Sequence, residues 1–276
     1  MKSSARLPIF AGMEERFAPI GGSRLRYLVG GSGPPLVLLH GIVASSFSFR
    51  FTFRELGRHF RLFVPDLRIV GVDGGLAATA SLLVQLLDQA QIDRADILGS
   101  SHGGSVAMEL AAQAPDRLRR MILVSPANPY AENYKKVVSF YLSPLGGIFI
   151  RMAPMMPVRL WEYGIGRMCA FPKSLAAGTG IGYREPLRIT GATQQIRSTL
   201  KSLNVDIAAL LPKLQRLAGI PSILIWGDLD PVVEMESGYR LQQTLQSKLA
   251  IMPGVGHLPY EENPAEFNRI VLEFLK

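Results

Sequence analysis

The chain has 276 residues, of which 48% are apolar and 19% are charged, so it can bury a large core and is not expected to be disordered. Its net charge of +8 arises from Lys and Arg scattered among Asp and Glu, without a basic run interleaved with aromatic residues, which argues against a nucleic-acid partner. The single cysteine, Cys169, cannot form an intrachain disulfide and fits a reducing, cytoplasmic location.

Neither the N-terminal segment nor the most apolar region of the chain has the pattern of a membrane-inserted helix. Residues 1–17 lack a sustained apolar stretch and a small-residue cleavage pattern, so we expect a short tail rather than a signal peptide. The most apolar region, 140–156, is interrupted by Ser143, Pro144, Arg151 and Pro154, so we expect no integral membrane segment.

Short apolar runs alternate with helical patterns along most of the chain. Such runs predict strands buried on both faces, and apolar residues at helical spacing predict amphipathic helices. The predicted strands cover 25–28, 36–39, 63–64, 97–98, 121–124, 223–226 and 249–252, and the predicted helices cover 76–87, 104–112 and 266–275. This alternation predicts an α/β fold with a parallel sheet between two layers of helices.

The middle of the chain breaks this alternation. Residues 128–203 are rich in Met, Tyr, Phe, Gly and Pro, which predicts a helical cap inserted into a core formed by 1–127 and 204–276. Its Met, Phe and Trp favour an apolar substrate pocket, although each one singly is better explained as the cap's own core. We interpret its basic residues as solvated surface, with attraction of an anionic substrate or membrane surface as the alternative: Lys135, Lys136, Arg151, Arg159, Arg167 and Lys173.

A glycine-rich turn follows the strand at 97–98. Gly99-Ser100-Ser101-His102-Gly103 matches G-x-S-x-G between a strand and a helix, which is the setting of a nucleophile elbow. Glycines at both ends remove side chains that would clash in so sharp a turn, and the helix N-terminus favours developing negative charge. The pattern predicts Ser101 as a nucleophile, with Ser100 and Ser105 as weaker candidates.

Two loops after the last strands supply a base and an acid. His257 follows the strand at 249–252, and Asp228 and Asp230 follow the strand at 223–226, so all three lie at the carboxyl edge of the sheet. Asp bonded to the imidazole fixes its tautomer and stabilises the imidazolium formed during attack. Spacing leaves the choice between the two aspartates open. The order Ser, Asp, His is that of α/β-type serine hydrolases.

The remaining histidines suggest other roles. His59 is expected at the surface, and His40 is expected to hold its loop by hydrogen bonding. The loop after His40-Gly41 leaves a strand at the same edge, so the backbone N–H groups of Ile42 and His102 are predicted to form an oxyanion hole.

Five stretches, in order, resemble the α/β-hydrolase fold family: LLHGIVASS, FVPDLR, ILGSSHGGSVAMELA, ILIWGDLDPVV and GVGHLPYEENP. The resemblance covers nearly all of the chain outside the cap. It implies a doubly wound, mostly parallel sheet of about eight strands, with the cap inserted after the sixth. In the family's G-x-x-D pattern the last residue is the triad acid, so the resemblance favours Asp230 over Asp228.

Three departures from family patterns narrow the activity. Serine at the elbow argues against haloalkane dehalogenases and epoxide hydrolases, which carry Asp there. Ile42 follows His40-Gly41, where some peroxidase-like and peptidase-like relatives have tryptophan or a glycine-rich run. The usual D-x-R-G-x-G appears as Asp66-Leu-Arg-Ile-Val-Gly, so that loop is altered.

These features predict a serine hydrolase that cleaves a small or medium, apolar carboxylic ester through an acyl-enzyme, with no cofactor or metal. The same triad also serves C–C bond hydrolysis, amide hydrolysis and acyl transfer, and the sequence pattern does not separate these reactions. A non-catalytic ligand-binding homologue is the alternative of a different class.

Overall fold

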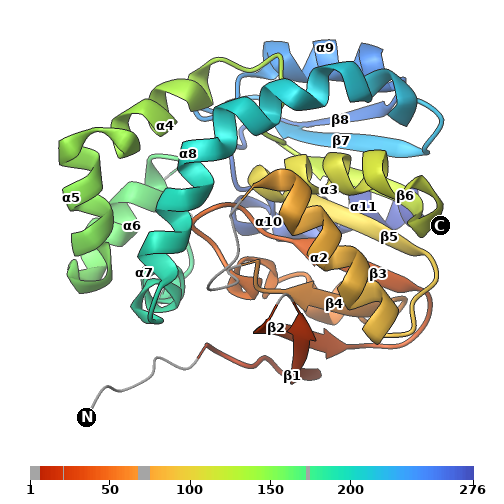
Figure 1. The fold of residues 1–276 in the computed structure, drawn as a ribbon, viewed down its shortest axis with the longest axis horizontal. Helices are drawn as coiled ribbons and strands as arrows, with labels where there is room; N and C mark the ends of the chain where they lie inside the picture. Colours follow the sequence, from red (N-terminus) through yellow and green to blue (C-terminus); the bar gives the residue numbers. More distant parts are fainter. Residues whose placement is uncertain (1–6, 21, 68–74, 172–174) are drawn as a thin grey trace.

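A computed structural model of the protein describes residues 7–20, 22–67, 75–171 and 175–276. In this part of the chain, a central sheet is covered by helices on both faces (Figure 1). The strands are β1 (Met13–Ile20), β2 (Ser23–Gly30), β3 (Pro35–Leu39), β4 (Arg61–Pro65), β5 (Ala95–Ser100), β6 (Leu118–Val124), β7 (Ser222–Gly227) and β8 (Lys248–Met252). The helices outside the β6–β7 connection are α1 (Phe53–Leu56), α2 (Leu76–Gln89), α3 (His102–Gln113), α9 (Met235–Leu245), α10 (Pro259–Glu262) and α11 (Pro264–Leu275).

The sheet has the order β1-β2-β4-β3-β5-β6-β7-β8. β2 pairs antiparallel with both β1 and β4, and every other neighbouring pair is parallel. β5 and β7 are buried along their whole length, as expected for strands covered on both faces. The predicted fold class, a doubly wound, mostly parallel sheet of about eight strands, is confirmed.

Two separate apolar cores fill the space between the sheet and the helices. One face of the sheet packs against α2, α3 and α9, and the other packs against α1, α10 and α11. Leu98 and Ile97 of β5 are neighbours in sequence but belong to different cores, because successive strand side chains point to opposite faces. The carboxyl ends of the parallel strands therefore meet at one edge, where the loops converge.

The prediction of a short tail over residues 1–17 is wrong from Met13 onward. Met13–Ile20 form β1, which pairs residue by residue with β2, from Met13 opposite Gly30 to Ile20 opposite Ser23. Most of this edge strand is exposed, so its apolar pattern is too weak to reveal a strand. Residues 1–6 of the predicted tail lie outside the described residues.

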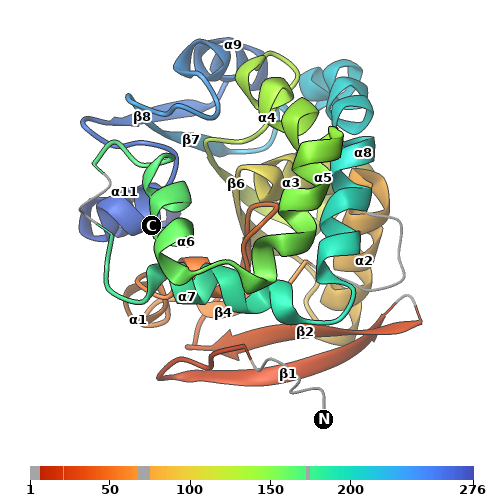
Figure 2. The ribbon, with the colours of Figure 1, turned by 90° about the vertical axis from the view of Figure 1, so that its left-hand side faces the viewer.

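Of the α-helices described between β6 and β7, four lie within residues 128–203, the segment predicted to be helical, and the last begins in it: α4 (Asn133–Leu142), α5 (Pro144–Met152), α6 (Val158–Gly166), α7 (Thr179–Arg184) and α8 (Ala192–Leu210). We call α4–α8 the helical insertion; Figure 2 views it face on. The predicted boundary at residue 203 lies inside α8, which contacts α4 and α5 and also α2 and α3 of the core.

Short 3-10 turns complete the described secondary structure: η1 (Ser46–Phe49), η2 (Pro115–Arg117), η3 (Ala153–Met155), η5 (Glu185–Arg188) and η6 (Leu211–Leu217). Among the described residues no single helix is long and apolar enough to cross a membrane. α4 and the helical segment Pro144–Met155 that follows it are long and apolar enough only when counted together, and the chain bends by 80° between them.

Candidate active site

Ser101 stands at a strained turn between β5 and α3. Its φ of 51° and ψ of −118° lie outside the regions that non-glycine residues ordinarily adopt. The turn is held in place because the Ser101 carbonyl accepts hydrogen bonds from the N–H groups of Gly104 and Ala127, at 2.9 and 3.2 Å. Backbone strain of this kind costs about 1–3 kcal/mol and persists only where the surroundings enforce it.

Glycines are required on both sides of this turn. A side chain at Gly99 would collide with the backbone of Gly103 and Gly104, and one at Gly103 would collide with the carbonyl of Leu39. The first turn of α3 therefore lies directly against the ends of β5 and β3, as the motif predicts.

The structure separates the three candidate serines. Ser100 is fully buried, and its Oγ donates to the Tyr260 hydroxyl at 3.2 Å. Ser105 is fully buried, and its Oγ donates to the carbonyl of Ala127 at 2.5 Å. Ser101 is partly exposed, so it is the one of the three that a substrate can reach.

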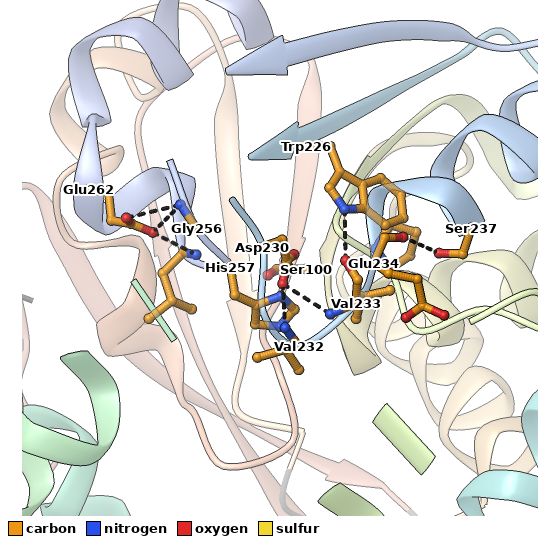
Figure 3. A network of polar contacts seen from close by, with 12 residues as sticks. Ser100, Trp226, Asp230, Val232, Val233, Glu234, Ser237, Gly256, His257 and Glu262 are labelled. Atoms are coloured by element: carbon orange, nitrogen blue, oxygen red, sulfur yellow. Dashed lines mark hydrogen bonds and ion pairs between the residues drawn. The ribbon is translucent and has the colours of Figure 1, made fainter. Parts of the chain in front are cut away.

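His257 and Asp230 come together from the loops after β8 and β7. His257 Nδ1 and Asp230 Oδ2 are 2.8 Å apart, and their side chains are only 4% and 0% exposed (Figure 3). The other oxygen of Asp230 accepts from the N–H groups of Val232 and Val233, at 2.8 and 3.0 Å. A carboxylate held this way keeps the imidazole in one orientation and leaves Nε2 as the nitrogen able to take a proton.

Asp228, the other aspartate left open by spacing, lies elsewhere. Its side chain is exposed and its Oδ1 accepts from the N–H of Gly254 at 2.7 Å. The structure therefore brings Asp230, and not Asp228, to His257.

Glu262 organises the His257 loop and was not singled out from the sequence. Its carboxylate accepts from the N–H groups of Gly256 (3.0 Å), Leu258 (3.2 Å) and Ala170 (2.8 Å), so it clamps the residues on both sides of His257 (Figure 3). The His257 N–H donates to the carbonyl of Met168 at 2.8 Å, which ties the same loop to the helical insertion. Nothing in a run of two glutamates on a short helix signals this role.

The loop after β3 lies beside the elbow. A Cβ placed on Gly41 would be 3.6 Å from Ser101 Cβ. His40 holds this loop as predicted, because its Nδ1 lies 2.7 Å from the carbonyl of Gly41 and its Nε2 accepts from the N–H of Leu67 at 2.9 Å. His59 is exposed, also as predicted.

The loop predicted to be altered, Asp66 to Gly71, is described only at its start. Asp66 is buried and accepts from the N–H of Ser46 at 2.7 Å and from Arg26, which anchors the end of β4. Residues 68–71 of that prediction lie outside the described residues.

The predicted oxyanion-hole donors belong to the residue after Ser101 and to the loop that follows β3. The N–H of His102 is at the first position of α3, and neither it nor the N–H of Ile42 bonds to another described residue. Such unpaired donors near a nucleophile suit a developing oxyanion. Burial, aided by the neighbouring His40, lowers the pKa of the His102 imidazole from 6.5 to about 4, so this ring is neutral at physiological pH.

No hydrogen bond joins Ser101 Oγ to His257 within the described chain. The preceding residue, Ser100, bonds to Tyr260 of α10, three positions after His257. Catalytic hydrogen bonds are commonly longer before a substrate is bound. A surface hollow of about 870 Å³ between η6 and α9 includes none of the predicted site residues, so its position does not bear on the chemistry at Ser101.

We compared the chain with models of known protein families. The model of the α/β hydrolase fold family matches residues 34–264, which span the elbow and both loops. The chain belongs to the α/β hydrolase fold family.

Relatives of several activities share the fold. The chain is 30% identical to an uncharacterized protein of Mycobacterium tuberculosis, over 94% of this chain and 80% of the relative. It is 26% identical to a 2-hydroxy-6-oxo-2,4-heptadienoate hydrolase of Pseudomonas putida (89% of this chain, 90% of the relative) and to a pimeloyl-[acyl-carrier protein] methyl ester esterase of Nitrosospira multiformis (89% and 96%).

Among solved structures, Cfl2 of Burkholderia cenocepacia superposes with a TM-score of 0.82 at 22% identity, over 96% of each chain. At this identity the likeness shows the fold alone. Since the relatives of named activity are hydrolases, the comparisons support a hydrolase that acts on a small-molecule substrate.

Proposed function

We propose that this protein is a serine hydrolase in which Ser101, His257 and Asp230 form the catalytic triad. The observation that carries the proposal is the buried 2.8 Å contact between His257 Nδ1 and Asp230 Oδ2 at the same sheet edge as the strained Ser101. A histidine and a carboxylate buried as a pair next to a nucleophile elbow have the arrangement required for acyl transfer.

The proposed reaction proceeds in two acyl-transfer steps. His257 Nε2 takes the proton of Ser101 while Ser101 Oγ attacks the ester carbonyl carbon, and the N–H groups of Ile42 and His102 stabilise the oxyanion. The oxyanion collapses, the C–O bond to the alcohol breaks, and His257 returns the proton to the leaving oxygen. Water, deprotonated by His257, then attacks the acyl-enzyme and releases the acid and free Ser101.

The proposed substrate is a small or medium carboxylic ester with an apolar group, and residues 128–203 act as its cap. Three observations support this choice. His257 is almost fully buried, its loop bonds to Met168 of the insertion, and Trp161 and Met156 of the insertion are only partly buried next to the core. Apolar side chains around a few polar groups are typical of small-molecule sites.

The first test compares the wild type with Ser101→Ala on p-nitrophenyl esters of short and medium chain length. We expect turnover in the wild type and its loss in the variant, with covalent fluorophosphonate labelling only of the wild type. Absence of both turnover and labelling in a folded wild-type protein would favour the non-catalytic ligand-binding homologue instead.

C–C bond hydrolysis is the second candidate, because two similar proteins are named as a 2-hydroxy-6-oxo-2,4-heptadienoate hydrolase and a 2-hydroxymuconate semialdehyde hydrolase. Both proposals use the same triad, so the substrate decides between them. A kcat/KM for 2-hydroxy-6-oxo-2,4-heptadienoate that exceeds the value for every ester tested would replace the ester proposal. Amide hydrolysis and acyl transfer to another acceptor are tested by the same comparison with aminoacyl amides and added alcohols.

A further inference from the structure

α5 of the helical insertion buries two glycines and Ile150 and exposes its other large apolar side chains. Gly146, Gly147 and Ile150 are buried. Four large side chains at the spacing i, i+3, i+4 and i+7 face solvent: Leu145 (74% exposed), Ile148 (59%), Phe149 (39%) and Met152 (49%). A helix on the surface of a globular protein ordinarily turns such a stripe toward the core.

The contact between α5 and α4 fixes this orientation. A side chain at Gly146 would collide with the backbone of Phe140 and Tyr141, and one at Gly147 would press on the guanidinium of Arg197 in α8. No side chain fits at Gly146 without displacing the backbone of α4, so the helix cannot turn its apolar stripe toward α4. Its exposure is a consequence of how α5 packs.

Neighbouring segments of the helical insertion expose further large apolar side chains. We call the resulting surface the outer face; it consists of the stripe on α5 together with Val137 and Phe140 of α4, Met155, and Leu160 and Tyr163 of α6, all of them exposed. α5 is the leftmost helix in Figure 1 and lies in front in Figure 2, so the outer face projects away from the core. Exposed large apolar side chains gathered on one side of a protein mark an interaction site.

Basic side chains outnumber acidic ones in the same segment. Residues 132–163 contain two glutamates, Glu132 and Glu162, one at each end, and four basic side chains: Lys135, Lys136, Arg151 and Arg159. Lys135 pairs with Glu132 at 2.6 Å. Arg151 and Arg159 are exposed and form no ion pair with any residue that the structure describes.

We infer that the outer face docks on the surface of an anionic lipid bilayer, with the α5 stripe in the headgroup–acyl boundary and the basic side chains against lipid phosphates. An exposed apolar helix face surrounded by more basic than acidic side chains is the combination that interfacial helices use. A second copy of the chain fits less well, because two outer faces would bring together surfaces that each carry more basic than acidic side chains, four against two. This inference does not depend on the proposed catalysis.

Flotation of the full chain with lipid vesicles tests the inference. We expect binding to phosphatidylcholine vesicles that contain phosphatidylserine, much weaker binding to phosphatidylcholine alone, and a decline as salt is raised. The double variant Leu145→Ser/Ile148→Ser should bind about tenfold less or weaker still, because it removes two buried apolar contacts. Arg151→Gln/Arg159→Gln should lose binding to the anionic vesicles specifically.

Matched controls separate the outer face from general surface properties. Val205→Ser/Ile251→Ser removes two exposed apolar side chains from α8 and β8, and Arg54→Gln/Arg216→Gln removes two exposed cations outside the insertion. Both controls should bind as the wild type does, and circular dichroism checks that every variant is folded. No binding by the wild type, or equal losses in control and outer-face variants, would overturn the inference. So would a wild-type dimer that Leu145→Ser/Ile148→Ser dissociates, which would assign the outer face to self-association.

Discussion

At the scale of single residues, the two aspartates after β7 differ in their contacts and in their burial. In Asp230→Asn, the amide oxygen can still accept from Val232 and Val233, so the amide N–H₂ faces His257 Nδ1. That pairing forces the wrong imidazole tautomer, and we expect kcat to fall by on the order of 10³–10⁴. Steady-state kinetics on the best p-nitrophenyl ester measure the effect.

Asp228→Asn is the control for this change. Its exposed side chain keeps an oxygen that can accept from Gly254, so kcat should stay near the wild-type value. A large loss of kcat in Asp228→Asn with a small one in Asp230→Asn would reverse the proposed assignment.

The Glu262→Gln variant tests whether the hydrogen bonds of Glu262 are needed to keep His257 in position. In Glu262→Gln one carboxylate oxygen becomes an N–H₂ group, so at least one of the three N–H donors loses its acceptor. We expect a loss of about 1–3 kcal/mol in the free energy of unfolding, and a lower kcat with little change in KM, because His257 is displaced. Urea denaturation and steady-state kinetics measure the two effects.

The matched control is Glu266→Gln on α11, whose carboxylate bonds only the exposed Arg269. It should leave kcat unchanged. If Glu262→Gln were less stable but fully active at saturating substrate, Glu262 would serve the fold and not the position of His257.

At the scale of elements, two helix glycines of the insertion have opposite surroundings. Gly164 in α6 is exposed with no atom near the position of a Cβ, so Gly164→Ala should raise the free energy of unfolding by about 0.5–1 kcal/mol. Gly146 in α5 faces the backbone of α4, so Gly146→Ala should lower it by about 1–3 kcal/mol. Urea denaturation gives both values, and a shift of the same sign in both variants would refute the described α4–α5 contact.

The elements also show which parts of the fold a sequence reveals. β3, β5 and β7 were predicted because strands buried on both faces are continuous apolar runs, and their shared direction brings Ser101 and Asp230 to one edge. β1 was missed because its partner β2, and not its own pattern, makes it a strand. α9 was missed because few of its side chains are apolar and buried. Spacing alone could not choose between Asp228 and Asp230, since that choice depends on how the β7 loop turns.

At the scale of the whole molecule, a buried polar network joins the core to the insertion. Arg50, beside η1, makes two hydrogen bonds to the carboxylate of Glu261 in α10, and Tyr183 of α7 donates to the same carboxylate at 3.1 Å. Burial raises the pKa of the Tyr183 phenol well above its usual value, so it stays protonated as a donor. The insertion is therefore tied to the helix that follows His257 as well as to the sheet.

The free energy of unfolding of the whole protein should depend on His102 in acid. The buried ring titrates at about 4 in the folded chain and near 6.5 in the unfolded chain, so the unfolded state binds more protons between these values. The contribution of neutral His102 is fully present above pH 6.5 and is lost as pH falls toward 4, which amounts to about 3 kcal/mol. Urea denaturation across this range measures it.

Other carboxylates titrate in the same range, so the comparison between variants isolates His102. In His102→Gln the buried ring is replaced by a neutral amide, and the fall in stability between pH 6.5 and 4 should be about 3 kcal/mol smaller than in the wild type. His59→Gln changes an imidazole that is exposed in the folded chain, so its pH dependence should follow the wild type. The change of unfolding free energy with pH is the quantity to compare, because either substitution also alters stability at neutral pH. Equal slopes in wild type and His102→Gln would mean that the ring beside Ser101 is charged or solvated in the folded protein, which would contradict the close packing of α3 against β3 and β5.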